Sequence, residues 1–316
     1  MPSGGTSCCS AIAEHLGITR DSVWKAVHKA GEALGLTVET VRGRGYRLVA
    51  ALELLDREQI LGGLSPTSRA CIQGLEIHDS IDSTNSHLMR QAQNGAASGL
   101  LCLAERQTAG RGRRGRSWVS PYGANIYLSL LWRYPFGPAE LAGISLAAGT
   151  AVAAALRAGG VQEVSLKWPN DVLWGRRAGL LVEVVGESGG PSHEVVGVGI
   201  NTRLDPTQAA PIDQPWVDLN KILGSKGFSR NRIAASVANE LIRVLDRYGR
   251  EGLAPFVSEW ERFDHYLGER VQVSVGDQRI VGIHAGITER GALRVRSGGS
   301  VITFRAGEVS LRPVEE

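Results

Sequence analysis

The pattern of apolar residues changes twice along the chain, and this change constrains the fold more than any other feature. Residues 10–48 contain two helical segments around a glycine turn, followed by an alternating run. From residue 74 to about residue 268, strand-like runs alternate with helical ones, and residues 270–316 contain only short β-branched runs broken by glycines. A chain of 316 residues with three such patterns predicts an α+β protein of three domains.

The first segment predicts a winged helix-turn-helix domain in residues 1–50. A helix over residues 10–16, a turn at Gly17 and a second helix capped by Thr19 precede a basic hairpin over residues 36–48. One interpretation is that the second helix enters a DNA major groove and the hairpin contacts phosphates; the alternative is a small docking module with a solvated basic hairpin. The DNA-binding candidates are Arg20, Ser22, Lys25, Arg42 and Arg44.

A complete winged helix has a further helix before this pair. Only nine residues, rich in Gly, Ser and Cys, precede Ser10, so we expect the first helix of the domain to be missing. Either the assigned start lies too far downstream or the domain is degenerate. Residues 51–73 are predicted to be a connector with a short helix over residues 52–61.

Residues 74–268 predict an α/β domain with a mixed sheet, and residues 269–316 predict a small β-barrel of about five strands. Strands of the larger domain are expected at residues 75–78, 99–105, 125–132, 163–167, 179–185 and 194–200. Helices are expected at residues 85–93, 138–158 and 231–248.

Charge and cysteine usage exclude several classes of protein. The 35 basic and 32 acidic residues leave a net charge of only +3, so no global field favours nucleic acid or a membrane. The four cysteines have neither C-x-x-C spacing nor an adjacent His cluster, so we predict no metal site and expect reduced thiols in the cytoplasm. The N-terminus lacks a signal-peptide pattern, and the longest apolar run, residues 141–156, is too short to span a membrane.

Residues 110–118 form the strongest local signal, a loop rich in glycine and arginine. The loop contains G-x-G-x-x-G, but it leads into another strand rather than a helix, which excludes the dinucleotide-binding interpretation. Between Glu105 and Glu140 there are six arginines and no acidic residue. This local charge suits a ligand that carries a carboxylate and phosphates; the alternative is a basic surface loop that maintains solubility.

Two shorter motifs offer both structural and functional interpretations. Lys167 ends a predicted strand, Trp168-Pro169 forms a turn, and Asp171 follows where it could hold a metal-bound phosphate. Residues 82–85 cap a helix, and they could also present hydroxyls and the helix N-terminus to a polar ligand.

Taken together, five segments resemble the biotin protein ligases in order and spacing, and most closely the bifunctional bacterial type that is also the biotin operon repressor. The segments are Asp82-Ser83-Thr84-Asn85, residues 107–118, Lys167-Trp168-Pro169-Asn170-Asp171, Gly179-Leu180-Leu181-Val182-Glu183 and Gly197-Val198-Gly199-Ile200-Asn201. Residues 282–312 resemble the C-terminal domain of the same family. The resemblance implies a central domain of the class II synthetase-like type and an SH3-like C-terminal barrel.

The resemblance implies a biotin–[acetyl-CoA-carboxylase] ligase that uses ATP and Mg²⁺ to convert biotin to biotinyl-5′-AMP. The biotin is then transferred to a lysine of the biotin carboxyl carrier protein of acetyl-CoA carboxylase. The adenylate would also act as corepressor for operator DNA binding, with a ligand-linked homodimer. The alternative is a biotin-sensing repressor whose ligase chemistry is weakened or lost; a lipoyl-type ligase should lack the Gly/Arg loop.

The resemblance also implies roles for individual residues. The family has an Arg-Lys pair before the strand that begins near Gly179, whereas Arg176 and Arg177 occur here, so either arginine could replace the family lysine at the phosphate. The biotin-binding candidates are Ser83, Thr84, Asn85, Gln107, Arg111, Gly112 and Arg113, and the catalytic candidates are Arg113, Lys167, Arg176 and Arg177. The candidates for ATP or adenylate binding are Arg116, Trp118, Asn170, Asp171, Asn201, Glu308 and Arg312.

Overall fold

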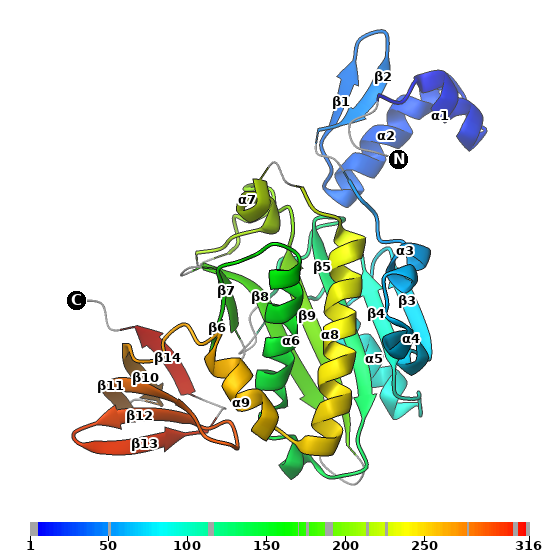
Figure 1. Cartoon of the computed structure of the whole chain (residues 1–316). Coiled ribbons are helices and arrows are strands. Elements are labelled where there is room, and N and C mark those ends of the chain that lie inside the picture. The colour runs from blue at the N-terminus through cyan, green and yellow to red at the C-terminus, as the bar shows by residue number, and fades with distance from the viewer. Residues whose placement is uncertain are drawn as a thin grey trace.

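A computed structural model describes the chain as three consecutive folded parts, with the N-terminal domain at one end of the molecule and the C-terminal sheet at the other (Figure 1). The described residues are 6–49, 52–112, 117–169, 171–174, 177–186, 192–212, 215–224, 227–276, 278–305 and 309–313. Within them, no helix combines the length and apolar character that crossing a membrane requires.

The N-terminal domain contains the predicted helix pair and hairpin. These are α1 (Cys9–Leu16), α2 (Arg20–Leu34), β1 (Val38–Val41) and β2 (Gly45–Leu48). Thr19 Oγ1 accepts from the Ser22 amide at 3.3 Å, so Thr19 caps α2 as predicted. The hairpin begins at residue 38 rather than 36 because Gly35 and Leu36 are used to end α2, the Leu36 amide donating to the Gly31 carbonyl at 2.8 Å.

The connector differs from the predicted single helix over residues 52–61. Helix α3 (Arg57–Gly62) begins five residues later, and a second helix, α4 (Pro66–Cys71), was not predicted. Residues 52–56 are not helical because their polar groups are bound to the following domain. Glu53 accepts from the amides at the start of helix α8 (Arg230–Glu251), and the Leu55 amide donates to Glu105.

The central domain is built on a mixed sheet, as predicted, but the sheet has seven strands rather than the six expected. Its order is β3-β4-β5-β9-β8-β7-β6, with β3 and β4 parallel and every other pair antiparallel. Strand β7 was not predicted because it follows the turn after Lys167 too closely to look like a separate strand. The strands are β3 (Gly74–His78), β4 (Leu100–Ala104), β5 (Asn125–Arg133), β6 (Val164–Lys167), β7 (Asp171–Trp174), β8 (Arg177–Gly186) and β9 (His193–Asn201).

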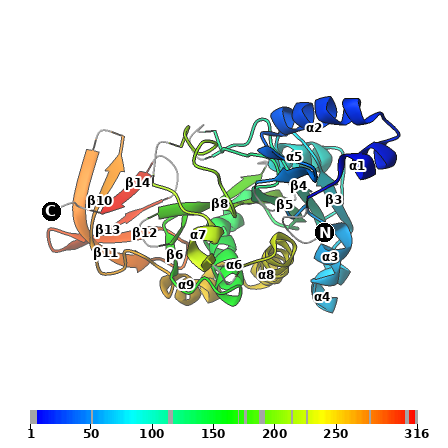
Figure 2. The same cartoon turned by 90° about the horizontal axis from the view of Figure 1, so that it is seen from above.

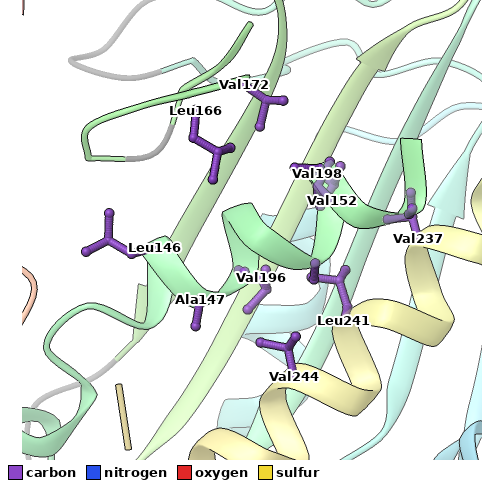
Figure 3. Close-up of a cluster of buried hydrophobic side chains, with 14 of the residues drawn as sticks. Leu146, Ala147, Val152, Leu166, Val172, Val196, Val198, Val237, Leu241 and Val244 are labelled. Atoms are coloured by element: carbon purple, nitrogen blue, oxygen red, sulfur yellow. The ribbon is translucent and has the colours of Figure 1, made fainter. Parts of the chain in front are cut away.

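Helices α6 (Ile144–Ala158) and α8 cover one face of this sheet, and α5 (Thr84–Gln93) covers the other (Figure 2). The α6/α8 face holds the main apolar core, in which alanines of α6 allow close approach to the sheet (Figure 3). The predicted helix 138–158 is broken: a 3₁₀ turn, η2 (Pro138–Leu141), ends before Gly143, whose φ of 89° lies in the left-handed region. A side chain at Gly143 would collide with Leu253.

The C-terminal part is a five-stranded antiparallel sheet of order β13-β12-β11-β10-β14. Trp168 fixes it to the central domain, because its indole Nε1 donates to the Gly291 carbonyl at 3.0 Å while the ring is 1% exposed. The strands are β10 (Arg270–Val275), β11 (Gln278–Ile287), β12 (Leu293–Ser297), β13 (Ser300–Phe304) and β14 (Val309–Pro313). Helices α7 (Leu219–Leu223) and α9 (Ala254–Glu261) complete the described elements.

Candidate functional site

A cavity that opens to solvent lies between the start of α5 and the middle of strands β5 and β9. Six of its eleven lining residues were predicted as ligand contacts from the sequence, and they come from two separate segments of the chain. The lining consists of Ser83, Thr84, Asn85, Gln107, Arg111, Trp118, Tyr127, Leu128, Gly197, Val198 and Gly199.

The start of α5 supplies the polar wall of the cavity. Ser83 caps the helix by accepting from the Ser86 amide, which leaves Thr84 and Asn85 on the first turn, 3% and 8% exposed. Ser129 of β5 lies beneath them, with its Oγ 2.7 Å from Thr84 Oγ1 and 2.5 Å from Asn85 Oδ1. This buried hydroxyl holds both side chains in a fixed orientation toward the cavity.

Gln107 connects the helix to the Gly/Arg loop. Its Oε1 accepts from the Thr84 amide at 2.9 Å, and its Nε2 donates to Ser120 Oγ at 3.4 Å. Ser120 in turn donates to the Trp118 carbonyl at 2.9 Å, and the Trp118 amide donates to the Gly110 carbonyl. The two ends of the loop are therefore fixed to the same wall of the cavity.

Two glycines of β9 leave room for the side chains of Asn85 and Trp118 beside the strand. A Cβ at Gly197 would overlap the amide of Asn85, and a Cβ at Gly199 would lie 2.9 Å from the Trp118 ring. Because successive side chains of a strand alternate between faces, these two glycines are on the same face, toward α5. The Trp118 Nε1 atom at this position is buried and has no hydrogen-bond partner in the described residues, which makes it a donor available to a ligand.

Asp82, next to the cavity wall, is committed to an ion pair. Arg90 donates to both of its carboxylate oxygens, at 2.8 and 3.0 Å. These bonds lower the pKa of Asp82 to about 2, so the carboxylate stays ionised at neutral pH. The pair fixes residue 82 against α5 rather than presenting a free carboxylate to the cavity.

Five other predicted site residues lie outside the cavity lining. Lys167 and Asp171 face each other across the β6–β7 turn, with Nζ and Oδ2 3.7 Å apart. Asn201 donates to the Val217 carbonyl, and Arg312 is exposed on β14. Gly112 follows the lining residue Arg111. Arg177 begins β8, but its side chain is not among those that the structure describes. The remaining predicted residues lie outside the described residues altogether: Arg113, Arg116, Asn170, Arg176 and Glu308.

All five DNA-binding candidates are exposed. Arg20, Ser22 and Lys25 lie on α2, and Arg42 and Arg44 lie at the turn between β1 and β2. Arg20 donates to Ser10 and Ser22 contacts Thr19, so these two side chains are partly engaged within the domain. The domain contacts the central part through Arg106, which donates to the Ala33 carbonyl at 2.9 Å, and through Gln208, which donates to Gly35.

The sequence did not identify Tyr127, Leu128, Val198 or Ser129 as site residues. A signal was available for Gly197 and Gly199, since two glycines spaced by two residues in a buried strand indicate that something packs closely on that face. No comparable signal existed for Ser129, because a single serine within an apolar strand has no distinctive pattern.

The side chains that line the cavity are suited to binding a ligand rather than to acid–base catalysis. Arg111 is its only residue charged at neutral pH, and burial raises the pKa of Tyr127, whose hydroxyl donates to the Pro121 carbonyl. The described lining therefore contains no general base for neutral pH. Uncharged donors and acceptors surrounded by apolar walls, with an arginine at the rim, suit a neutral polar ring joined to an anionic group.

Comparison with known proteins is consistent with this geometry. Residues 77–201 match the Biotin/lipoate A/B protein ligase family, residues 266–312 match the Biotin protein ligase C terminal domain, and residues 9–47 match an HTH domain. The chain is 39% identical over 307 residues to the bifunctional ligase/repressor BirA of Escherichia coli, covering 96% of this chain and 92% of that protein. It is 35% identical to the biotin--[acetyl-CoA-carboxylase] ligase of Mycobacterium tuberculosis, covering 80% and 92%.

Among solved structures, the biotin protein ligase of Aquifex aeolicus in complex with biotin and ATP has a TM-score of 0.65 and 28% identity. The match covers 77% of this chain and all of that one. The helix-turn-helix match adds residues 9–47, and the alignment with the bifunctional relative covers 96% of this chain. The chain therefore belongs to the biotin protein ligase family, as one of its bifunctional ligase/repressors with an N-terminal helix-turn-helix domain.

Proposed function

We propose that the cavity binds biotin and that the chain joins it to AMP before transferring it to a carrier protein. In the first step the biotin carboxylate attacks the α-phosphorus of ATP, and pyrophosphate leaves. In the second, an uncharged lysine amine attacks the carbonyl of biotinyl-5′-AMP; AMP leaves, the amide forms, and the amine proton passes to solvent. The amine that we propose belongs to the biotin carboxyl carrier protein of acetyl-CoA carboxylase.

The observation that carries this proposal is the set of uncharged donors and acceptors in the cavity. Ser83, Thr84, Asn85 and Gln107 would hydrogen-bond the ureido ring, with Ser129 setting the orientation of two of them. The ring of Tyr127 and the backbone of β9 at Gly197 and Gly199, which carry no side chain, would contact the hydrocarbon part of biotin. The unpartnered N–H of Trp118 would donate to the bound ligand, on the side where the loop begins.

The arginine-rich loop would neutralise charge when a carboxylate approaches a triphosphate. Arg111, at the exposed rim of the cavity, would contact the carboxylate or the adenylate phosphate, together with Gly112 and Arg113. We propose that Lys167, Arg176 and Arg177 are also catalytic residues, as positive charges near the phosphates. The residues proposed to bind ATP or adenylate are Arg116, Trp118, Asn170, Asp171, Asn201, Glu308 and Arg312.

Mg²⁺ would enter with the nucleotide, as MgATP. It prefers carboxylate and phosphate oxygens, yet the only described group of three or more metal-binding side chains contains two His and one Cys. Asp171, the carboxylate proposed to lie near the phosphates, faces Lys167 at 3.7 Å. The described residues therefore do not fit a resident Mg²⁺ ion, and the phosphates of the substrate would supply its main ligands.

A transfer assay tests the ligase function. The chain is incubated with MgATP, labelled biotin and a carrier domain, with a carrier whose acceptor lysine is replaced by arginine as control. Label in the first carrier and none in the second supports the proposal. Adenylate formation without transfer, or biotin binding without adenylate, would favour the alternative of a biotin-sensing repressor that has lost its chemistry. Thr84→Val should weaken biotin binding about tenfold through lost hydrogen bonds, whereas Cys71→Ser should not.

We also propose that the N-terminal domain represses transcription by binding operator DNA. The exposed cations on α2 and on the hairpin support this, as does the helix-turn-helix match. A binding site is first selected from a random DNA library in the presence of biotin and ATP. Specific affinity that increases with both ligands supports repression; equal affinity with and without them contradicts it.

A double variant identifies the phosphate contacts of the hairpin. Arg42→Ala with Arg44→Ala should reduce the slope of log affinity against log salt by about two, since each lost phosphate contact releases about one counterion fewer. Arg69→Ala removes an exposed cation from α4 and should leave the slope unchanged. An unchanged slope in the double variant would remove the hairpin from the DNA interface.

Finer structural features belong to the same proposal. The central sheet with α5, α6 and α8 is consistent with a class II synthetase-like domain, and the C-terminal sheet with an SH3-like barrel. We propose a ligand-linked homodimer, which sedimentation with and without biotin plus ATP would test. The four free thiols suit a reducing compartment, so we propose a cytoplasmic location.

A further inference from the structure

Four side chains with metal-binding atoms gather at the β3 edge of the central sheet. Glu76 and His78 lie on β3, Cys102 lies on β4, and His87 lies on α5 above them. One donor atom from each lies within 4.8 Å of all the others. Glu76 and Cys102 are direct cross-strand partners, so the sheet register itself brings these two side chains together on the α5 face.

The two imidazoles point at the same carboxylate oxygen. His87 Nε2 is 2.6 Å and His78 Nε2 is 3.2 Å from Glu76 Oε2, and the two rings are 5.0 Å apart. Cys102 is fully buried below this group, whereas about a third of the Glu76 and His78 side chains is exposed. An ion could therefore enter from solvent on one side and meet the thiol on the other.

We propose that Glu76, His78, His87 and Cys102 form a binding site for one Zn²⁺ ion. Two imidazole nitrogens, one sulfur and one carboxylate oxygen are ligands that zinc accepts in a tetrahedral arrangement. Bond lengths of about 2.0–2.3 Å place tetrahedral ligands about 3.5 Å apart. The widest pair must therefore approach by up to about 1.3 Å, and His87 Nε2 and Glu76 Oε2, which are 2.6 Å apart, must separate by about 1 Å. Rotation of the partly exposed His78 and Glu76 side chains supplies this movement. Nitrogen and sulfur donors disfavour Mg²⁺ and Ca²⁺.

The charges balance when the ion binds. Cys102 is fully buried and enters as a thiol, and zinc displaces its proton: Cys–SH and Zn²⁺ give Cys–S–Zn⁺ and H⁺, which is released to solvent. Glu76 Oε2 lies within hydrogen-bonding distance of both His87 Nε2 and His78 Nε2, so the carboxylate already faces the other ligands. One thiolate and one carboxylate then neutralise the two charges of the ion in a partly buried position.

The site lies beside the cavity and shares no residue with its lining. Cross-strand partners form one row under α5, from Glu76 through Cys102 and Ser129 to Gly197. His87 occupies the edge of this row, and Asn85, two residues earlier on α5, lies over its middle. Zinc bound at His87 would hold α5 to the edge strand β3. Because the zinc ligands are separate from the cavity lining, zinc binding can be measured independently of the ligase reaction.

Cobalt titration tests the proposal on the full-length chain after treatment with a chelator. Cobalt bound by a thiolate gives a charge-transfer absorption band, which should saturate at one ion per chain and disappear when Zn²⁺ is added. Cys102→Ser should lose this band, while Cys71→Ser, which removes a partly buried thiol outside the site, should retain it. Absence of the band in the unmodified chain, or its loss in the Cys71 variant instead, would overturn the site.

Substitutions of the two partly exposed ligands, Glu76 and His78, test the site even if the Cys102→Ser variant does not fold. Zn²⁺ should raise the Tm of the unmodified chain, because an ion that binds only the folded state stabilises it. His78→Gln and Glu76→Gln should each weaken zinc binding about tenfold or more and reduce the Tm shift, whereas His15→Gln on α1 should not. Equal zinc affinity in all these chains would contradict the proposal.

Discussion

The two faces of the central sheet differ in what they contain. On the α6/α8 face, strand residues such as Leu128, Val196 and Val198 pack against apolar helix residues with almost no exposed area. On the α5 face, the same strands present Ser129, Gly197 and Gly199, and the cavity lies there. One face therefore supplies most of the free energy of folding, and the other, with a smaller apolar cluster around Leu88, carries the candidate binding site.

This difference follows from the alternation of side chains along β5 and β9. Every second residue of these strands points into the apolar core. The residues between them point to the α5 face, where polar and small side chains can be accommodated. A substitution on the α6/α8 face should change the stability of the protein and leave the affinity of the folded molecule for biotin unaltered. A substitution on the α5 face should do the reverse, and the following variants test how complete this division is.

The largest expected effect is on the α6/α8 face. Leu241 of α8 is fully buried, so Leu241→Ala should lower the free energy of unfolding by about 2–5 kcal/mol through lost burial and a cavity. Urea unfolding measures this loss. Calorimetry below the unfolding transition should give an unchanged biotin Kd; a tenfold weaker Kd of the folded variant would show that the two faces are not separate.

Glu194 is the exception that can sharpen the comparison. It lies on the same side of β9 as Val196, it is 5% exposed, and burial raises its pKa to about 7 from an ordinary 4.5. The folded state therefore holds this proton longer than the unfolded state, so stability present below pH 4.5 is lost as the pH rises to about 7. At one pKa unit per 1.36 kcal/mol, the loss is about 3 kcal/mol.

Glu194→Gln should remove this pH dependence. The free energy of unfolding, measured in urea between pH 5 and pH 8, should decline in the unmodified chain and remain nearly constant in the variant. Glu163→Gln serves as control, since Glu163 is exposed in the turn before β6. Parallel curves for the unmodified and Glu194 variant chains would mean that the carboxyl is ionised throughout this range.

On the α5 face, Gly197→Ala should cost about 1–3 kcal/mol of biotin affinity, because the added methyl group displaces Asn85 from its bond with Ser129. This corresponds to a Kd about 5- to 150-fold higher, measurable by calorimetry. Gly62→Ala places a methyl group in open space at the end of α3 and should change neither affinity nor stability by more than about 0.5 kcal/mol. An unchanged Kd for the Gly197 variant would separate Asn85 from biotin recognition.

The smallest expected effect is at Ser129. Ser129→Ala removes the hydroxyl that orients Thr84 and Asn85, at a cost of about 1 kcal/mol in binding, or a Kd about fivefold higher. Ser165→Ala is the matched control. Ser165 lies on the edge strand β6, outside the cavity, and its hydroxyl hydrogen-bonds His265. A Kd that rises equally in both variants would contradict a specific role for Ser129.

The sequence predicted those parts of the site that are encoded locally. The helix cap at Ser83 and the glycines and arginines around Arg111 have recognisable patterns because short-range geometry requires them. Ser129 could not be identified, since its role depends on its register opposite Gly197. The same applies to Glu76, His87 and Cys102, whose separation along the chain resembles no zinc motif and whose proximity arises only when β3, β4 and α5 assemble.

Departures from the predicted elements also came from contacts between distant residues. Residues 52–56 have helix-forming side chains, yet Glu53 is recruited to the start of α8 and the segment stays extended. The break at Gly143 is imposed by Leu253, more than a hundred residues away. Such tertiary contacts override local preference and cannot be inferred from a single segment.

The bond between Arg106 and the Ala33 carbonyl gives the two ligand-binding parts of the molecule a common joint. It holds α2 at its last turn, while the next residue, Gln107, lines the cavity. Helix α2 has 15 residues and is therefore about 22 Å long. A rotation of about 10° at this joint carries Arg20, at the far end, through about 4 Å, roughly the spacing of successive base pairs along DNA. A shift beside the cavity that turned α2 about this bond would therefore be largest at the end of the helix that carries Arg20.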